Sequence, residues 1–286
     1  MTYKIATIAA SVIALTSSAA SAEKWDMALA YAASNYHSEI AAEFAAEVTA
    51  NSDLEIVTHP GGSLFAGAEI FGAVRKGLAP IGERLISALG TDDAVDEVDS
   101  VPFLATGFYS TVEATDLDAL SGLKYRAYNA TKSKMAEGLG MVPTKIEAAE
   151  LAQAFATGTA QSMISSGSTG YDRKLWEHVD YYYDVKAWLP RNMVIVNGKA
   201  WAGLDDATKD VITTAAATAE TACWAKAEEL DGWYIEQFKE QGMTIGTLPD
   251  SVQAEFERVG AELRAEWAER AGEKGAAILE AYEAAK

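Results

Sequence analysis

The stretch Leu120–Ala130, LSGLKYRAYNA, has the alternating pattern of a buried β-strand, with an arginine inside it. Apolar positions 123, 125 and 127 alternate with Lys124, Arg126 and Tyr128, and a Ser-Gly turn precedes them. Removing an arginine from water is costly unless a negative group meets it. The pattern therefore predicts a strand of a buried sheet and raises the question of what Arg126 meets.

Short strands and helices alternate on both sides of this stretch. Helical patterns are predicted at 39–50, 68–76, 131–139 and 148–157, and strand patterns at 25–30, 54–58, 123–128, 141–145, 161–164, 181–183 and 193–196. The acidic segment 91–101 and the Ser/Gly-rich segment 165–170 are predicted to be loops. This alternation predicts an α/β fold with largely parallel pairing, and its repetition predicts two lobes with a cleft between them.

A long helix follows, from about Asp205 to Gln241. At 1.5 Å per residue it would be about 55 Å long, more than the width of one lobe, so we expect it to run along both. A final helix begins near Asp250, and its inward face is predicted to carry Val252, Phe256, Leu263 and Trp267.

The N-terminus has the three parts of a secretory signal peptide. Lys4 is the only charge before Glu23, the run 5–15 is mostly apolar, and Ala20-Ser21-Ala22 forms an A-x-A site. We expect cleavage after Ala22 and a periplasmic location. The apolar run is shorter than the roughly 20 residues that a spanning helix needs, and no later stretch is apolar enough to span a bilayer.

Charge and cysteine content exclude several classes of partner and site. Residues 23–286 number 264 and carry 22 basic and 42 acidic side chains, so nucleic acid and anionic lipid would be repelled. The single cysteine, Cys223, cannot form an internal disulfide, and its helical surroundings predict a small buried residue. The three histidines lack metal-ligand spacing, and no nucleotide-binding motif occurs, so no metal or cofactor is predicted.

A hydrolase is the alternative from a different class. The segments HPGGSLFAG and SSGSTG contain exposed-looking serines, yet neither satisfies G-x-S-x-G. Ser63 or Ser166 could form a triad with His37 and an aspartate, although nothing in their spacing favours it, and Ser166 with His37 is the candidate pair.

Anion binding has better support. Ligands of α/β proteins bind beyond the carboxyl ends of parallel strands, and Arg126 lies near the end of its predicted strand. Its planar guanidinium matches a carboxylate through two parallel hydrogen bonds. The pattern alone leaves a second interpretation open, in which Arg126 pairs with one of the many acidic side chains of the protein itself.

Six segments in order resemble a known family. They are FAAEVTANSDLEIVTHPGGSL, AVRKG, DSVPFLAT, LSGLKYRAYN, AAELAQAFATGTAQSMISSG and WEHVDYYYDVKAWLPRNMVIVNGKAW. Together they resemble the solute-binding proteins of tripartite ATP-independent periplasmic (TRAP) transporters, of the dicarboxylate-receptor type. The resemblance implies a two-lobed, type II periplasmic-binding-protein-like fold that closes on an organic acid anion. It also implies delivery of that ligand to a membrane permease, and a monomeric protein without enzymatic activity.

The resemblance assigns candidate ligand-binding residues. Arg126 occupies the place of the arginine that grips the carboxylate in that family. The other pocket positions fall at Tyr31, His37, Glu83, Asn129, Ser165 and Trp188. Each has a structural alternative: Asn129 as a helix cap, Glu83 as a solvated residue beside Arg84, His37 as a surface or helix-start residue, and Trp188 as a core aromatic.

One departure from the family concerns the residues between the PFL and GLK segments. Only 105–121 intervene, whereas the family has several dozen residues there, so the second lobe is expected to lack a helix and a strand pair. The resulting lobes would be 23–106 with 191–230, and 107–190 with 231–286. A receptor with impaired binding is therefore a further alternative.

Overall fold

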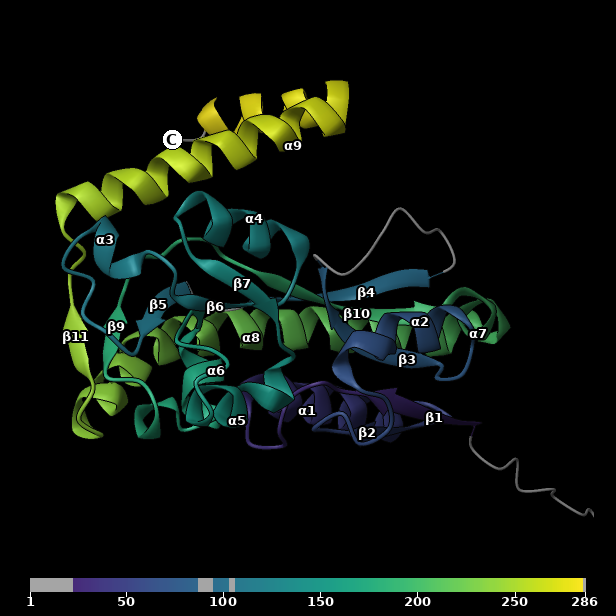
Figure 1. The fold of residues 1–286 in the computed structure, drawn as a ribbon. Coiled ribbons are helices and arrows are strands. Elements are labelled where there is room, and N and C mark those ends of the chain that lie inside the picture. The colour runs from purple at the N-terminus through teal and green to yellow at the C-terminus, as the bar shows by residue number, and fades with distance from the viewer. Residues whose placement is uncertain (1–22, 87–94, 103–105, 285–286) are drawn as a thin grey trace, which may run out of the picture.

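The computed structural model describes residues 23–86, 95–102 and 106–284, and these residues form two β-sheets flanked by helices (Figure 1). The first sheet has the strand order β2-β1-β3-β10-β4. Its strands are β1 (Glu23–Ala28), β2 (Leu54–His59), β3 (Ile81–Leu85), β4 (Val95–Pro102) and β10 (Arg191–Asn197).

The second sheet has the strand order β11-β9-β5-β8-β6-β7. Its strands are β5 (Thr106–Ser110), β6 (Lys124–Ala127), β7 (Val142–Lys145), β8 (Ser162–Ser166), β9 (Tyr181–Tyr183) and β11 (Thr244–Gly246). In β6, Arg126 lies opposite Thr144 of β7 and Met163 of β8. The strand predicted at 123–128 is thus an interior strand of this sheet.

Each sheet is parallel apart from one reversed strand. β10 is antiparallel to β3 and β4, and β5 is antiparallel to β8 and β9, while the other pairings are parallel. Each reversed strand is the first strand after a change of sheet along the chain: β5 follows β4 of the first sheet, and β10 follows β9 of the second. A strand entering from the opposite sheet starts at the edge where the parallel strands end, so it runs against them. The expected parallel pairing is therefore only partly right.

Short helices cover the outer faces of the sheets. They are α1 (Tyr36–Asn51), η1 (Gly67–Glu69), α2 (Ile70–Arg75), α3 (Leu117–Leu120), α4 (Ala130–Gly138), η3 (Ala148–Glu150), α5 (Leu151–Ala156), α6 (Gly167–Asp172), η4 (Leu175–Glu177) and α7 (Gly198–Gly203). Several begin at a side-chain cap: Asn35 accepts from the His37 N–H at α1, and Asn129 accepts from the Lys132 N–H at α4.

Two long helices complete the fold. α8 (Asp206–Glu240) runs the length of the molecule and contacts α1 and β4 of one half and α6 and β11 of the other (Figure 1). α9 (Asp250–Ala284) lies over α4 and changes direction at Gly272, whose φ of 58° suits a residue without a Cβ. Within the described ranges, neither helix combines the length and apolarity needed to cross a bilayer.

The apolar core follows from this arrangement. One cluster extends along α8 beneath both sheets and includes Trp25, Tyr109 and Cys223, which is buried as expected. A second cluster lies between the second sheet and α9, where Val252 is buried and Phe256 and Leu263 pack against it. The continuous core along α8 packs against both sheets and thereby fixes their positions relative to each other.

Two segments predicted as loops are regular structure. The acidic segment 91–101 contains most of β4, because pairing with β10 overrides its unfavourable composition. The Ser/Gly segment 165–170 completes β8 and begins α6, since the Ser166 hydroxyl caps that helix by accepting from the Thr169 N–H. β5 and β11 are strands that the sequence patterns did not predict.

Candidate functional site

A cavity of about 720 Å³ lies between the two sheets, where their parallel strands end. From the first sheet it is lined by residues after β1 and β2, by the end of β3 and by Pro190. From the second sheet it is lined by the first residue of β5 and by the ends of β6, β7 and β8. Loops at strand ends place polar side chains and backbone groups in such a space without breaking the sheets.

Arg126 faces this cavity from β6 and is only 4% exposed. Its Nε donates a hydrogen bond to the carbonyl of Ile146 at 2.8 Å, which fixes the plane of the guanidinium. Burial lowers the pKa of the Arg126 guanidinium, yet an arginine remains charged in a folded protein. None of the described residues forms an ion pair with Arg126. Within this part of the chain the guanidinium contacts one carbonyl and one aromatic ring, and it faces the cavity.

That ring belongs to Tyr128, which also lines the cavity. The Arg126 Cζ lies 4.9 Å from the Tyr128 ring centroid, a favourable cation–π distance. Burial raises the pKa of Tyr128 to about 12, so its hydroxyl is neutral at physiological pH. Trp188 is not among the lining residues, and its Nε1 donates to the Tyr128 hydroxyl at 3.2 Å. Trp188 thus supports the tyrosine from outside the cavity.

Asn129 and Ser165 both line the cavity. Asn129 also caps α4, so the helix-cap interpretation is right, and the same residue lies at the cavity wall. Ser165 lies at the end of β8, beside the capping residue Ser166. The family-based assignment of these two residues therefore agrees with their position at the cavity wall.

Tyr31 lines the cavity from the loop after β1. Its carbonyl accepts from the Gly61 N–H at 2.5 Å, and Gly62 N–H donates to the carbonyl of Leu29 at 2.9 Å. Gly61 and Gly62 have φ values of 70° and 71°, a region that favours glycine and lets the loop after β2 turn against the Tyr31 loop. These two loops form one wall of the cavity.

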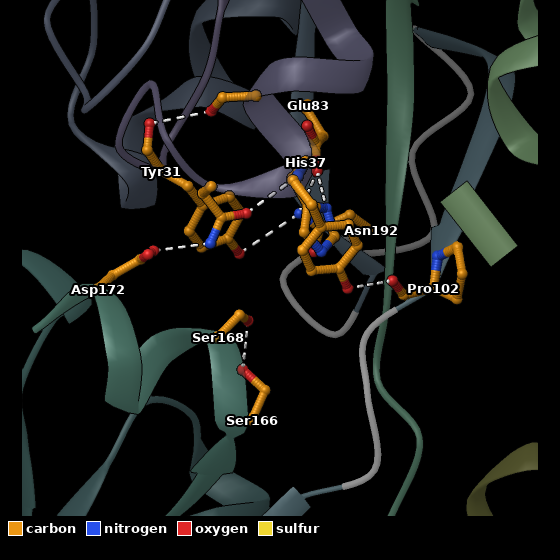
Figure 2. A network of polar contacts seen from close by, with 11 residues as sticks. Tyr31, His37, Glu83, Pro102, Ser166, Ser168, Asp172 and Asn192 are labelled. Carbon is orange, nitrogen blue, oxygen red and sulfur yellow. Dashed lines mark hydrogen bonds and ion pairs between the residues drawn. The ribbon is translucent and has the colours of Figure 1, made fainter. Parts of the chain in front are cut away.

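Glu83 and His37 are buried and do not line the cavity, and they belong to a network of polar contacts that includes Tyr31 (Figure 2). His37 Nδ1 lies 2.7 Å from Glu83 Oε1, and Asn192 Nδ2 donates to the same oxygen at 2.6 Å. Asn192 Nδ2 also donates to the Tyr31 hydroxyl at 3.3 Å. The solvated interpretation of Glu83 is wrong. Through Asn192, the network instead positions the Tyr31 hydroxyl.

Arg84 is a charged lining residue that the sequence interpretation missed. It follows Glu83 directly, and successive side chains of a strand point to opposite faces. Glu83 shares the face of Ile81, which packs in the core with α1, whereas Arg84 shares the face of Gly82, which lies against α2. The apolar residue at 81 is the sequence signal that would have distinguished the two.

A hydrogen bond also joins the two halves of the molecule beside the cavity. The Asn35 side chain, at the start of α1, donates from Nδ2 to Asp172 Oδ2 at 2.7 Å (Figure 2). Asp172 is the last residue of α6, which follows the second sheet. Burial raises the pKa of the Asp172 carboxyl, and the hydrogen bond from Asn35 opposes that shift. The contact fixes α1 against α6.

The hydrolase alternative is not favoured by the geometry. The Ser166 hydroxyl lies 3.0 Å from those of Ser168 and Thr169 and caps α6, while His37 Nδ1 meets Glu83. Within the described ranges no hydrogen bond joins Ser166 to His37. The part of the chain that the structure describes contains no cluster of three or more His, Cys, Asp or Glu side chains suited to a metal ion.

Lys132 is a buried lysine next to the cavity. Its Nζ lies 2.7 Å from the centroid of the Trp188 ring, and the side chain is in the first turn of α4. Burial lowers the pKa of the Lys132 amine to about 6, whereas the ring face favours the charged form. Burial outweighs the ring because no described carboxylate pairs with the amine, and an unpaired buried charge costs several kcal/mol against about 2 kcal/mol for a cation–π contact.

Lys132→Met is therefore expected to stabilise the protein at pH 7 by about 1–2 kcal/mol. The unfolded chain holds the proton up to the ordinary pKa of 10.5, whereas the folded protein releases it above about 6. Native stability should thus rise with pH across this window, and the advantage of the variant should shrink toward pH 10. Urea unfolding at pH 7 and pH 10 measures both effects. Lys134→Met, which removes a half-exposed lysine from the same helix, is the control. A loss of stability in Lys132→Met at pH 7 would contradict the prediction.

Comparisons with known proteins identify the family. The model of the bacterial extracellular solute-binding proteins, family 7 (DctP), matches residues 105–270. A TRAP solute-binding protein from a marine metagenome, solved with co-purified pyroglutamate, is 40% identical, with a TM-score of 0.87 over 92% of this chain and 99% of that one. The chain belongs to the family 7 extracellular solute-binding proteins.

Two further members of this family come from Bordetella pertussis, and both are extracytoplasmic solute receptors that bind pyroglutamic acid. DctP7 is 30% identical, with a TM-score of 0.88 over 92% of this chain and all of that one (100%). DctP6 is 33% identical, with a TM-score of 0.85 over 91% of this chain and 99% of that one. The α/β, two-lobed periplasmic-binding-protein-like fold and the TRAP resemblance predicted from the sequence are confirmed.

Proposed function

We propose that this family 7 protein is a receptor that captures a small organic acid anion in the cavity between its sheets. The observation that carries the proposal is Arg126, a buried cation that faces a cavity of about 720 Å³ and has no described acidic partner. A buried guanidinium that faces such a cavity offers a planar fork that matches a carboxylate. Withdrawal of the ligand from water would strengthen the ion pair.

Pyroglutamate is the first ligand to test, because three relatives of 30% identity or more bind it. It is a compact anion that carries one carboxylate and one lactam carbonyl. Arg126 would take the carboxylate, and Tyr31, Asn129 and Ser165 would complete the wall around the ring. Glu83, His37 and Trp188 would act through the residues that they hold in place, and not by touching the ligand.

Membership of the family supports further proposals about export, location and partners of the protein. Residues 1–22 lie outside the described residues, and we propose that they are a signal peptide cleaved after Ala22, with the remaining chain acting as a monomer in the periplasm. The ligand would be delivered to TRAP-type permease subunits, and no reaction would be catalysed.

We also propose the division into lobes 23–106 with 191–230 and 107–190 with 231–286, which the membership of the two sheets supports. The shortening between 105 and 121 stays a prediction. This segment contains β5 and α3.

A thermal-shift measurement tests the receptor function. Saturating pyroglutamate is expected to raise the unfolding midpoint by several degrees, because ligand at about 100 times its Kd stabilises by about 2.7 kcal/mol. The matched control is 2-pyrrolidinone, which has the same lactam ring without the carboxylate and should give no shift. A panel of other hydroxy, keto and sugar acids covers the alternative ligands. If no acid in the panel shifts the midpoint, the proposal fails and the impaired-receptor alternative replaces it.

A further inference from the structure

Arg84 is a second arginine in the same cavity, contributed by the opposite sheet from Arg126. It is the fourth residue of β3 and is half-buried. Its neighbour Glu83 points to the other face of the sheet and is engaged by His37 and Asn192. Glu83 therefore leaves the positive charge of Arg84 without a carboxylate in direct contact.

One donor of the Arg84 guanidinium lacks an acceptor among the described residues. Its Nε is shielded from solvent and makes no hydrogen bond to any of the residues that the structure describes. Nη1 lies beside the backbone of Gly67, where a Cβ would come within 3.7 Å of it. A shielded donor of a charged group costs free energy while it lacks an acceptor. Because Nε is shielded, a contact with a ligand would fall to the Nη groups of Arg84, whose side chain lines the cavity.

The cavity wall has an excess of positive charge, with three basic residues (Arg84, Arg126 and Lys145) and one acidic residue, Glu147. Lys145 differs from the two arginines because its side chain is 71% exposed and lies 3.8 Å from the Glu147 carboxylate. A carboxylate that binds the Arg126 fork uses both of its oxygens there. Arg84 comes from the other sheet, so an acceptor on the far side of the ligand can meet it while the Arg126 fork holds the carboxylate.

We propose that Arg84 is a specificity-determining residue, which selects organic acids with a second oxygen acceptor at a distance from the carboxylate held by Arg126. This inference rests on the proposed receptor function and deepens it by defining the ligand class. Lactam, keto and second carboxylate oxygens belong to the class, and an acid with a purely hydrocarbon body does not. The two arginines would bind the ligand from both sheets at once.

Calorimetry of the full chain with two acids tests this selection. L-Pyroglutamate has the second acceptor, and cyclopentanecarboxylate has a ring of the same size with a carboxylate and no carbonyl. Arg84→Met is expected to weaken pyroglutamate binding by about 10- to 100-fold, the range of one charge-assisted hydrogen bond. Its effect on cyclopentanecarboxylate should be under about threefold, since the carboxylate contact is intact.

Controls separate this inference from the receptor function itself. Lys76→Met removes an exposed charge that does not line the cavity, and should change neither affinity by more than about twofold. Arg84→Gln provides a second variant in case Arg84→Met does not fold, as judged by its unfolding midpoint. Equal weakening of both acids by either folded variant overturns the selection while the receptor function stands. If the native protein binds neither acid, the proposal that it is a pyroglutamate receptor and this inference are both overturned.

Discussion

Arg126→Met is expected to weaken pyroglutamate binding by about 150- to 5,000-fold. Removing one partner of a buried charge pair costs about 3–5 kcal/mol, because the other charge is left without compensation. In the variant the ligand carboxylate would lie in a cavity that has lost the guanidinium fork. Isothermal titration of the native chain and of the variant, in the same buffer and salt, measures the difference.

The ligand-free variant provides the internal control. Arg126 is a buried cation with no described acidic partner, so its replacement by an apolar side chain of similar length should not lower the unfolding midpoint. Replacement removes the cost of burying an uncompensated charge, and the lost hydrogen bond to Ile146 offsets part of that gain in stability. Arg126→Lys keeps the charge and loses the planar fork, so we expect an intermediate loss of about 10-fold or more. Unchanged affinity in a folded Arg126→Met protein would remove Arg126 from the anchoring role.

The sequence was informative where one local pattern determines both fold and function. The alternation around Arg126 places the arginine in an interior strand, and the strand ends near the cavity because parallel strands of one sheet end at the same edge. The length of α8 was enough to predict that it contacts both halves. These features follow from periodicity, which tertiary contacts seldom overturn.

Other features depend on contacts that periodicity does not contain. The strand β4 has an acidic composition that disfavours a strand, and it forms through its pairing with β10, which lies some ninety residues later in the chain. Glu83 was expected in the pocket and Arg84 was not, because a shift of one residue in a strand exchanges its two faces. The apolar residue Ile81 marks the core face of β3, and its packing with the α1 residues of the core agrees with Arg84, and not Glu83, lining the cavity.

Glu83→Leu is expected to destabilise the protein by about 3–5 kcal/mol, the usual cost of breaking a buried pair from one side. Glu83 is 1% exposed, and its Oε1 receives Asn192 Nδ2 at 2.6 Å and lies 2.7 Å from His37 Nδ1. Leucine would leave these two polar groups without their carboxylate. Since 1 kcal/mol corresponds to about 2–4 °C in a chain of this size, the unfolding midpoint should fall by about 10 °C.

Two comparisons make this prediction specific to the buried network. Glu83→Gln keeps an oxygen acceptor for Asn192 and should lose less than Glu83→Leu, whereas Glu55→Gln on the exposed side of β2 should change little. The double variant His37→Leu/Glu83→Leu should be less destabilised than the sum of the two single variants, because neither polar group is then left opposite an apolar one. Additive losses in this cycle, measured by urea unfolding, would mean that His37 and Glu83 contribute independently. Tyr31 would then owe its position to the loop at Gly61 and Gly62 and not to the network behind it.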